Sequence, residues 1–69
     1  MRDLLVLEGK VIAREQERLG VMLQVPGRTE LVYLLAAEAR IFRALYPGLV
    51  CRLEIEDGYV RSWSPASSS

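Results

Sequence analysis

The sequence lacks several residues on which enzymes and metal proteins depend. It contains no histidine and only one cysteine, Cys51. Without histidine no Ser-His or Cys-His catalytic pair can form, and a lone thiol neither closes an internal disulfide nor supplies a zinc site. The chain also lacks a glycine-rich phosphate loop. We interpret the acidic residues Glu54, Glu56 and Asp57 as solvated charges, and we expect no enzyme activity, no cofactor and no metal.

Net charge and long apolar segments are absent as well. Nine basic and nine acidic residues give a formal charge of zero, so no overall attraction draws the chain to nucleic acid or to an anionic membrane. No segment approaches the about 20 apolar residues of a membrane span, and the apolar run Leu4–Leu7 is too short for a signal peptide. A single cysteine suits a reducing compartment. These features predict a cytoplasmic protein without membrane association.

The size of the chain limits its core. Its 69 residues, of which 51% are hydrophobic, suffice for one small domain. A domain of this size buries only about 60% of its unfolded surface, and no disulfide or metal reinforces it. We expect one domain over residues 1–63 and a disordered polar tail over residues 64–69.

Alternation of apolar and polar residues predicts five strands. They span Leu4–Ala13, Val21–Val25, Thr29–Leu35, Leu49–Glu56 and Tyr59–Trp63. In the first strand a glycine marks a bend or bulge. One face of that strand carries Leu5, Leu7, Gly9, Val11 and Ala13, and the other carries Glu8, Lys10 and Arg14. Between the third and fourth strands the period becomes helical over Ala36–Tyr46, and Pro47-Gly48 ends the helix.

The last two strands form the clearest local pattern. Asp57-Gly58 is a two-residue turn of the I′ kind, in which both residues take positive φ. This turn predicts the cross-strand pairs Glu56 with Tyr59, Ile55 with Val60, Glu54 with Arg61, and Arg52 with Trp63. The apolar phases of all elements predict a core that contains Val11, Leu23, Ile41, Cys51, Leu53, Ile55 and Val60. On this interpretation the cysteine is an inert core residue, and the alternative is a reactive or intermolecular thiol.

The order of three strands, a short helix and two strands predicts an all-β fold, a five-stranded OB-like barrel. An SH3-like barrel usually has its helical turn between the fourth and fifth strands, whereas an OB-fold has its helix between the third and fourth. The segments that fit the second arrangement include Glu8-Gly9-Lys10-Val11, Val21–Val25, Leu34–Ala44, Pro47-Gly48-Leu49-Val50 and Cys51–Ile55.

On these segments the chain resembles the small OB-fold proteins of the bacterial translation initiation factor one and S1-type family. The resemblance covers roughly Leu5 to Arg61 and implies the fold. Members of that family meet ribosomal RNA through a basic helix and loop. Here Arg40 and Arg43 are the only basic residues between Ala36 and Ala44, so the resemblance does not imply the ribosomal role.

Two surfaces are candidates for binding. The first is the predicted outer face of the last hairpin, where aromatic and basic residues alternate as in OB-folds that stack bases and bind phosphates. Its residues are Arg52, Tyr59, Arg61 and Trp63. Two other interpretations stay open. The pairs Arg52 with Trp63 and Glu54 with Arg61 could be purely structural, or the tryptophan could join Leu31, Tyr33 and Leu35 in a protein interface.

The second surface is the third strand with the helix, because Leu31–Leu35 is apolar on both faces. Its candidate partner-binding residues are Leu31, Tyr33, Leu35, Phe42 and Tyr46. Two functions follow. The first is a small protein-interaction or self-associating module that binds a protein partner or forms a homo-oligomer. The alternative is a single-stranded nucleic-acid (RNA) binding OB-fold protein.

Overall fold

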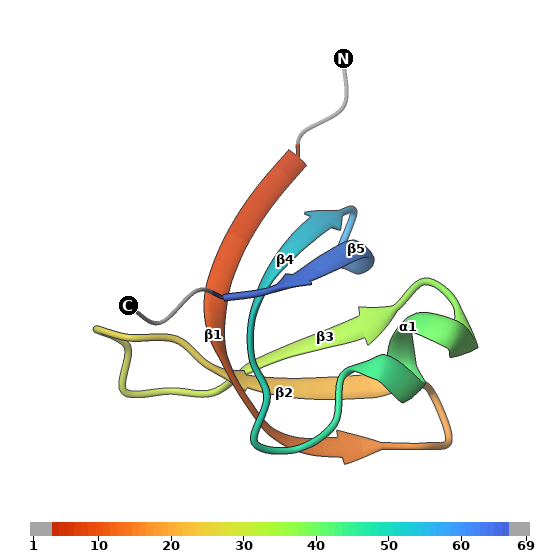
Figure 1. Ribbon diagram of the computed structural model, residues 1–69, viewed down its shortest axis with the longest axis horizontal. Coiled ribbons are helices and arrows are strands. Elements are labelled where there is room, and N and C mark those ends of the chain that lie inside the picture. Colours follow the sequence, from red (N-terminus) through yellow and green to blue (C-terminus); the bar gives the residue numbers. More distant parts are fainter. Residues whose placement is uncertain (1–3, 67–69) are drawn as a thin grey trace.

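Strands make up most of this computed structural model, which describes residues 4–66 (Figure 1). The elements are β1 (Leu4–Glu15), β2 (Gly20–Gln24), β3 (Val32–Ala36), α1 (Ala39–Ala44), β4 (Val50–Glu56) and β5 (Tyr59–Pro65). A mostly β chain with five strands and one short helix between the third and fourth is therefore confirmed. The helix is too short to cross a membrane, and it is the one helix in the described part of the chain.

The strands form one sheet around the long strand β1. The N-terminal half of β1, Leu4–Lys10, pairs with β4, and its C-terminal half, Lys10–Glu15, pairs with β2. Two further ladders join β2 to β3 and β4 to β5. These two ladders and the two of β1 are all antiparallel. A short parallel ladder between β3 and β5 completes the order β1-β2-β3-β5-β4, which returns to β1.

Two features let β1 leave β4 and join β2. At Gly9 a Cβ atom would collide with the backbone oxygen of Gln24, so only glycine permits the close approach of β2. The bulge that the sequence predicts near this glycine lies three residues later, at Ile12, between the pairs of Val11 and Ala13. Because successive side chains of a strand point to opposite faces, one extra residue moves all later side chains of that strand to the other face.

The bulge corrects the predicted faces at the end of β1. Ala13 pairs with the exposed Met22 and thus lies on the outer face instead of the inner one. Arg14 pairs with the fully buried Val21, so its side chain turns toward the core side. Its guanidinium donates a 2.8 Å hydrogen bond to the carbonyl oxygen of Phe42 and lies 4.7 Å from the centre of that ring.

A second bulge corrects the register of the last hairpin. Asp57 and Gly58 have φ of 55° and 81°, and the predicted pairs Glu56–Tyr59 and Ile55–Val60 are confirmed. Beyond them Arg61 is the extra residue. The predicted pairs Glu54–Arg61 and Arg52–Trp63 are wrong, and the pairs that form are Glu54 with Ser62, Leu53 with Trp63 and Arg52 with Ser64.

Element boundaries also differ from the prediction: the third strand begins at Val32 instead of Thr29, and the largest differences are at the helix and at the C-terminus. The helix is six residues long because Ala36 and Ala37 join β5 instead, the first through the ladder and the second through a 3.0 Å hydrogen bond to the Val60 oxygen. The predicted disordered tail is wrong for residues 64–66. β5 runs to Pro65, and the N–H of Ala66 donates to the Val50 oxygen at 3.0 Å. Residues 67–69 of that tail lie outside the described residues.

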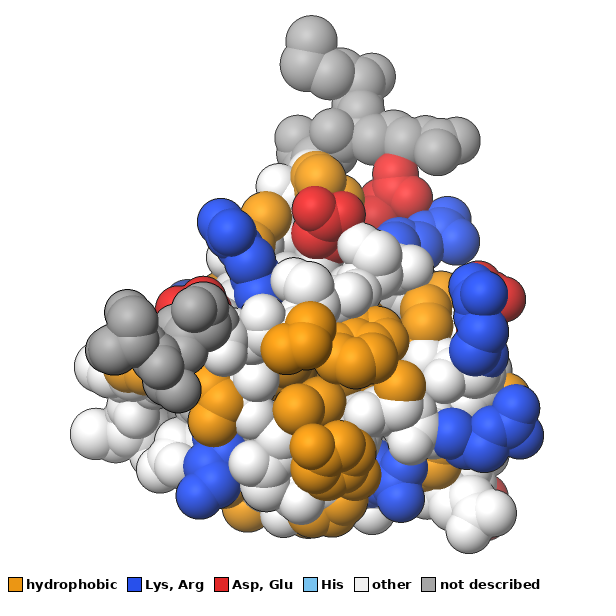
Figure 2. Space-filling view, viewed as in Figure 1, with side chains coloured by type: hydrophobic (Ala, Val, Ile, Leu, Met, Phe, Trp, Pro, Cys, Tyr) orange, Lys and Arg blue, Asp and Glu red, His pale blue; other side chains and the backbone are white. Residues whose placement is uncertain are grey.

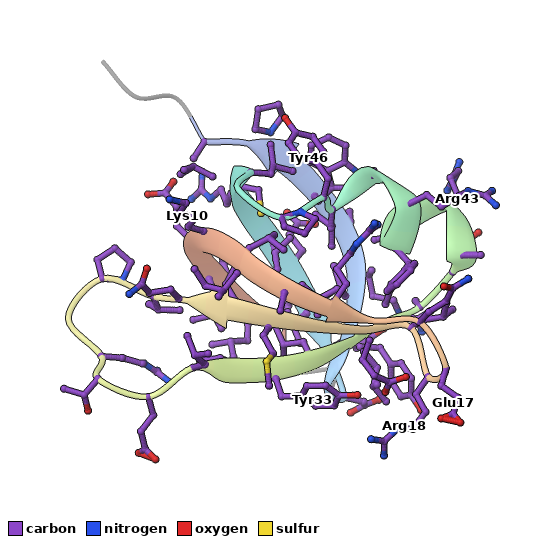
Figure 3. The ribbon with its side chains drawn as sticks, turned by 90° about the horizontal axis from the view of Figure 1, so that it is seen from below. Lys10, Glu17, Arg18, Tyr33, Arg43 and Tyr46 are labelled. Atoms are coloured by element: carbon purple, nitrogen blue, oxygen red, sulfur yellow. The ribbon has the colours of Figure 1, made fainter. Side chains whose placement is uncertain are left out.

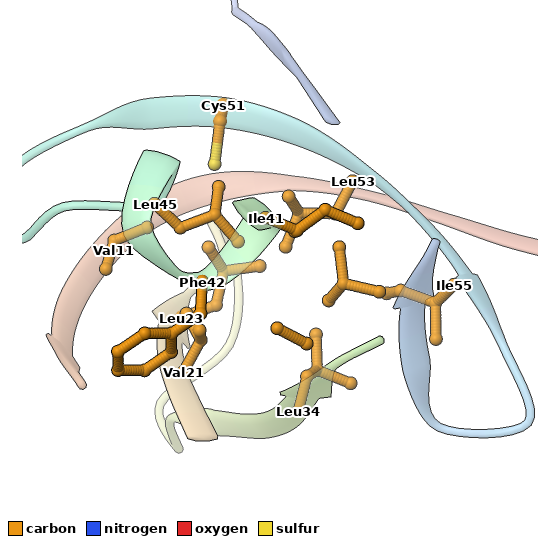
Figure 4. Close-up of a cluster of buried hydrophobic side chains, with 12 residues drawn as sticks. Val11, Val21, Leu23, Leu34, Ile41, Phe42, Leu45, Cys51, Leu53 and Ile55 are labelled. Carbon is orange, nitrogen blue, oxygen red and sulfur yellow. The ribbon is translucent and has the colours of Figure 1, made fainter. Parts of the chain in front are cut away.

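The core lies between the sheet and α1 (Figure 4). All seven residues predicted for it are at most 4% exposed: Val11, Leu23, Ile41, Cys51, Leu53, Ile55 and Val60. The core prediction is confirmed. Burial raises the pKa of the Cys51 thiol, which disfavours the reactive thiolate.

Candidate interaction surfaces

The outer surface of β1, β2, β3 and β5 carries a continuous set of apolar side chains. In one cross-strand row Met22 lies between Ala13 and Tyr33, and in the next row Leu35 lies between Gly20 and Tyr59. Directly paired residues place their side chains on the same side of a sheet. We name the apolar set the Tyr33 face, and its members are Ala13, Met22, Tyr33, Leu35 and Tyr59. Met22, Tyr33 and Tyr59 are 38%, 41% and 46% exposed.

Tyr33 is held in place by its neighbours. A Cβ atom at Gly20 would collide with the tyrosine ring, so the glycine provides the space over which the ring lies. The Tyr33 hydroxyl donates a 3.0 Å hydrogen bond to Oε1 of Glu15. Arg18 lies over the same ring, with its Cζ atom 5.9 Å from the ring centre. The face therefore presents an aromatic ring whose orientation is set before any partner arrives.

Glu15 organises the turn between β1 and β2. Its carboxylate accepts a 2.8 Å hydrogen bond from the backbone N–H of Arg18 and a 3.0 Å bond from the Nε of the same residue. The backbone N–H of Arg18 is the main reason that the pKa of Glu15 lies below its ordinary value of 4.5. Desolvation, followed by the hydrogen bond to Glu15, raises the pKa of Tyr33 above its ordinary value.

The five predicted partner-binding residues do not form one surface. Leu31 and Tyr33 are 45% and 41% exposed, and Leu35 is half-buried. Phe42 is only 7% exposed and belongs to the core, so the structure contradicts its predicted place on an exposed surface. Tyr46 is 54% exposed, but Figure 3 places it on the opposite side of the molecule from Tyr33.

The four predicted nucleic-acid-binding residues are also separated. Arg52 lies opposite Glu8 on one side and Ser64 on the other, on the outer face of β4. Tyr59 belongs to the Tyr33 face. The Arg61 Nε contacts Oε1 of Glu56 at 3.0 Å. Trp63 is opposite Leu53 and packs half-buried against the core.

Trp63 instead lies in a shallow groove between α1 and β5. The groove has a volume of about 390 Å³ and is lined by Arg40, Ile41, Ala44, Arg61, Ser62 and Trp63. Figure 2 shows hydrophobic side chains gathered in the middle of the face that Figure 1 presents, with basic side chains at several points of its edge. The alternating pattern of β5 predicted that Trp63 lies on the outer face, so the sequence did not indicate this groove. The bulge at Arg61 turns the tryptophan inward.

A further exposed apolar segment stands at the start of β1, where Leu4, Leu5 and Val6 are 57%, 53% and 43% exposed. Figure 1 shows this half of β1 extending beyond β2 and β3, with β4 beside it. Sequence reasoning assigned the segment to a strand and missed the surface. The available signal was the one noticed in β3, a short run that is apolar on both faces.

Comparisons of the chain with protein-family models, with curated proteins and with solved structures find no match.

Proposed function

We propose that the chain is an OB-like barrel that works as a protein-interaction module. The strand order β1-β2-β3-β5-β4, the parallel ladder between β3 and β5, and a helix between β3 and β4 support this class of fold. In OB-folds the outer face of the second and third strands, with its flanking loops, is the surface that binds oligonucleotides and oligosaccharides. The Tyr33 face occupies the corresponding position here.

One observation carries the choice of a protein partner. The two cross-strand rows join apolar side chains of four strands, and the charged residue at their β1 end, Glu15 opposite Gly20, is already bound to Arg18 and Tyr33. The nearest cation over the tyrosine ring, Arg18, is bound to Glu15 at 3.0 Å. Binding of single-stranded nucleic acid depends on cations that contact phosphates. An apolar aromatic surface with a polar border suits a protein surface better.

The alternative, single-stranded RNA binding, has less support. It relied on Arg52, Tyr59, Arg61 and Trp63 sharing one face. The bulge at Arg61 places Trp63 on the core side of β5 and leaves Arg52 on the outer face of β4. Base stacking on both aromatic residues by one strand of RNA would need a path around β5.

Photo-crosslinking tests the proposal. A photoreactive amino acid placed at Met22 lies in the Tyr33 face, and one placed at Val50 provides a control because Val50 is also an exposed apolar strand residue, at 44% against 38%. After irradiation of cells that produce the tagged chain, we expect a discrete protein adduct from position 22 and none from position 50. Equal adducts from both positions, or RNA adducts from position 22, would contradict the proposal.

A further inference from the structure

The N-terminal half of β1 has an unpaired edge. Residues Leu4–Glu8 pair with β4 on one side. On the other side of β1, pairing with β2 starts only at Lys10, which lies opposite Gln24. Within residues 4–66 no other strand pairs with this side of Leu4–Glu8. An unpaired strand edge presents a row of backbone N–H and C=O groups that can pair with another chain.

The side chains beside this edge are apolar on both faces of the strand. Leu4 and Val6 lie on one face and Leu5 and Leu7 on the other. The first three residues of the segment are 57%, 53% and 43% exposed. Exposed contiguous apolar segments of this kind mark interaction sites. The first charged residue after Leu4 is Glu8.

Native proteins usually protect such edges with charges, proline or bulges. Another open edge of the sheet, that of β5, has this protection. Beyond Val60, β5 has ladder partners only in β4 among the described residues, and it carries the bulge at Arg61 and the proline Pro65. Neither feature occurs between Leu4 and Leu7. The β1 edge thus lacks the protection that the β5 edge carries, and it can accept a partner strand.

We propose that the partner is a second copy of this chain, paired antiparallel through β1 about a two-fold axis. An axis perpendicular to the sheet joins like faces, so Leu5 and Leu7 of one copy lie beside Leu7 and Leu5 of the other. In a register centred on Val6, the two Glu8 residues are separated by about 13 Å along the strands at about 3.3 Å per residue. The segment is thus complementary to itself in hydrogen bonding and in apolar surface, and its like charges lie apart.

The dimer is a reversible one. Pairing of five residues from each copy covers less surface than the about 800 Å² per partner of a standard interface. Its sheet runs in the order β5-β4-β1 and continues through β1-β4-β5 of the second copy. The inference does not depend on the Tyr33 face, whose residues on β1 lie at the other end of that strand.

Sedimentation of three proteins tests this proposal. The wild type is compared with Val6→Lys, which places a charge at the edge, and with Met22→Lys, which places the same charge on the Tyr33 face at a similarly exposed residue, 38% against 43%. Val6 lies opposite Glu54, so a lysine there gains an opposite-charge neighbour and the variant retains its fold. Circular dichroism verifies folding, and Leu5→Lys, whose side chain would lie beside Leu7 of the second copy, repeats the test at a still more exposed position.

Over about 10 µM to 1 mM, we expect the mass of the wild type and of Met22→Lys to rise from 7.8 kDa toward twice that value. Both edge variants should remain at the mass of one chain. Over the same range, hydrogen exchange at the amides of Leu4–Glu8 should slow in the wild type and in Met22→Lys, and not in the two edge variants. A wild type that stays monomeric at the highest concentration overturns the proposal. Dissociation by Met22→Lys and not by Val6→Lys also overturns it, and assigns self-association to the Tyr33 face instead.

Discussion

Glu15 shows how one side chain connects the turn between β1 and β2 to the Tyr33 face. Its carboxylate accepts hydrogen bonds from the backbone and side chain of Arg18 and from the hydroxyl of Tyr33. The pKa of Glu15 is lowered mainly by the Arg18 backbone N–H. A lowered pKa in the folded state means that the carboxylate stabilises the fold above its ordinary value of 4.5, and that this stabilisation is lost as the pH falls through the folded value.

The first prediction follows from the lowered pKa of Glu15. Between pH 7 and about pH 3, the wild type should lose more stability against urea than Glu15→Gln, which has no carboxylate to protonate. Glu17→Gln is the matched control, because Glu17 lies exposed in the same turn and makes no hydrogen bond or ion pair among the described residues. Parallel pH profiles for the wild type and Glu15→Gln would show that the carboxylate does not stabilise this turn.

Leu53 gives a second prediction at the same scale. Its side chain is fully buried at 0% exposure, whereas Leu5, one strand away on β1, is 53% exposed. Truncation of a buried leucine removes transfer free energy and leaves a cavity, so Leu53→Ala should cost about 2–5 kcal/mol. Leu5→Ala should cost under about 1 kcal/mol at low protein concentration. Urea unfolding followed by Trp63 fluorescence measures both. A loss below about 1 kcal/mol for Leu53→Ala would mean that the phase of β4 is inverted.

At the scale of the elements, local signals were sufficient where the structure is local. Period-two patterns located five strands, and Asp57-Gly58 defined the turn, because these depend on neighbouring residues. The two bulges depend on pairing over long distances. β1 requires an extra residue at Ile12 to change partners, and β5 takes one at Arg61. Neither has a sequence signature, and each moves the residues after it to the other face.

The end of the helix explains the failure of the second predicted surface. Phe42 and Tyr46 are four residues apart and would share one face of a helix that continued to Tyr46. The helix ends at Ala44, and Leu45 has φ −89° and ψ 71°, so the chain turns away before Tyr46. Exposure of Leu31 and Tyr33 was predictable from the two-sided apolar run in β3. The contribution of Met22 and Tyr59 to the same face required the registers of β2 and β5.

The third prediction depends on the bulge in β5, which turns Trp63 toward the core. Because Trp63 packs half-buried against the core, Trp63→Ala should cost about 1–3 kcal/mol of stability, part of the cost of truncating a fully buried aromatic residue. Tyr59, on the same strand, is 46% exposed, so Tyr59→Ala should cost less. Thermal unfolding followed by circular dichroism compares the two variants without using the tryptophan signal. A larger loss for Tyr59→Ala would contradict the register that the bulge creates.

At the scale of the whole molecule, β1 serves two surfaces at its two ends. Residues 4–8 form the unpaired edge, and residues 13–15 border the Tyr33 face. A dimer through the edge therefore carries two copies of the Tyr33 face. Two linked copies of a weak binding surface bind a repeated or dimeric partner more tightly than one copy does, provided that both can engage together. Under the two proposals above, self-association and partner binding reinforce each other without sharing residues.

The last prediction concerns how the stability of this dimer depends on concentration. Any process that joins folded chains and not unfolded ones raises the melting temperature with concentration by mass action. For a folded dimer, a tenfold increase in concentration adds about 0.7 kcal/mol per chain, which corresponds to about 3–5 °C for a domain of this size. The wild type and Met22→Lys should show this slope by calorimetry once the dimer is populated. Val6→Lys should melt at one temperature throughout, because its folded and unfolded states are both single chains. A concentration-independent melting temperature for the wild type would exclude stabilisation of the fold by pairing of β1.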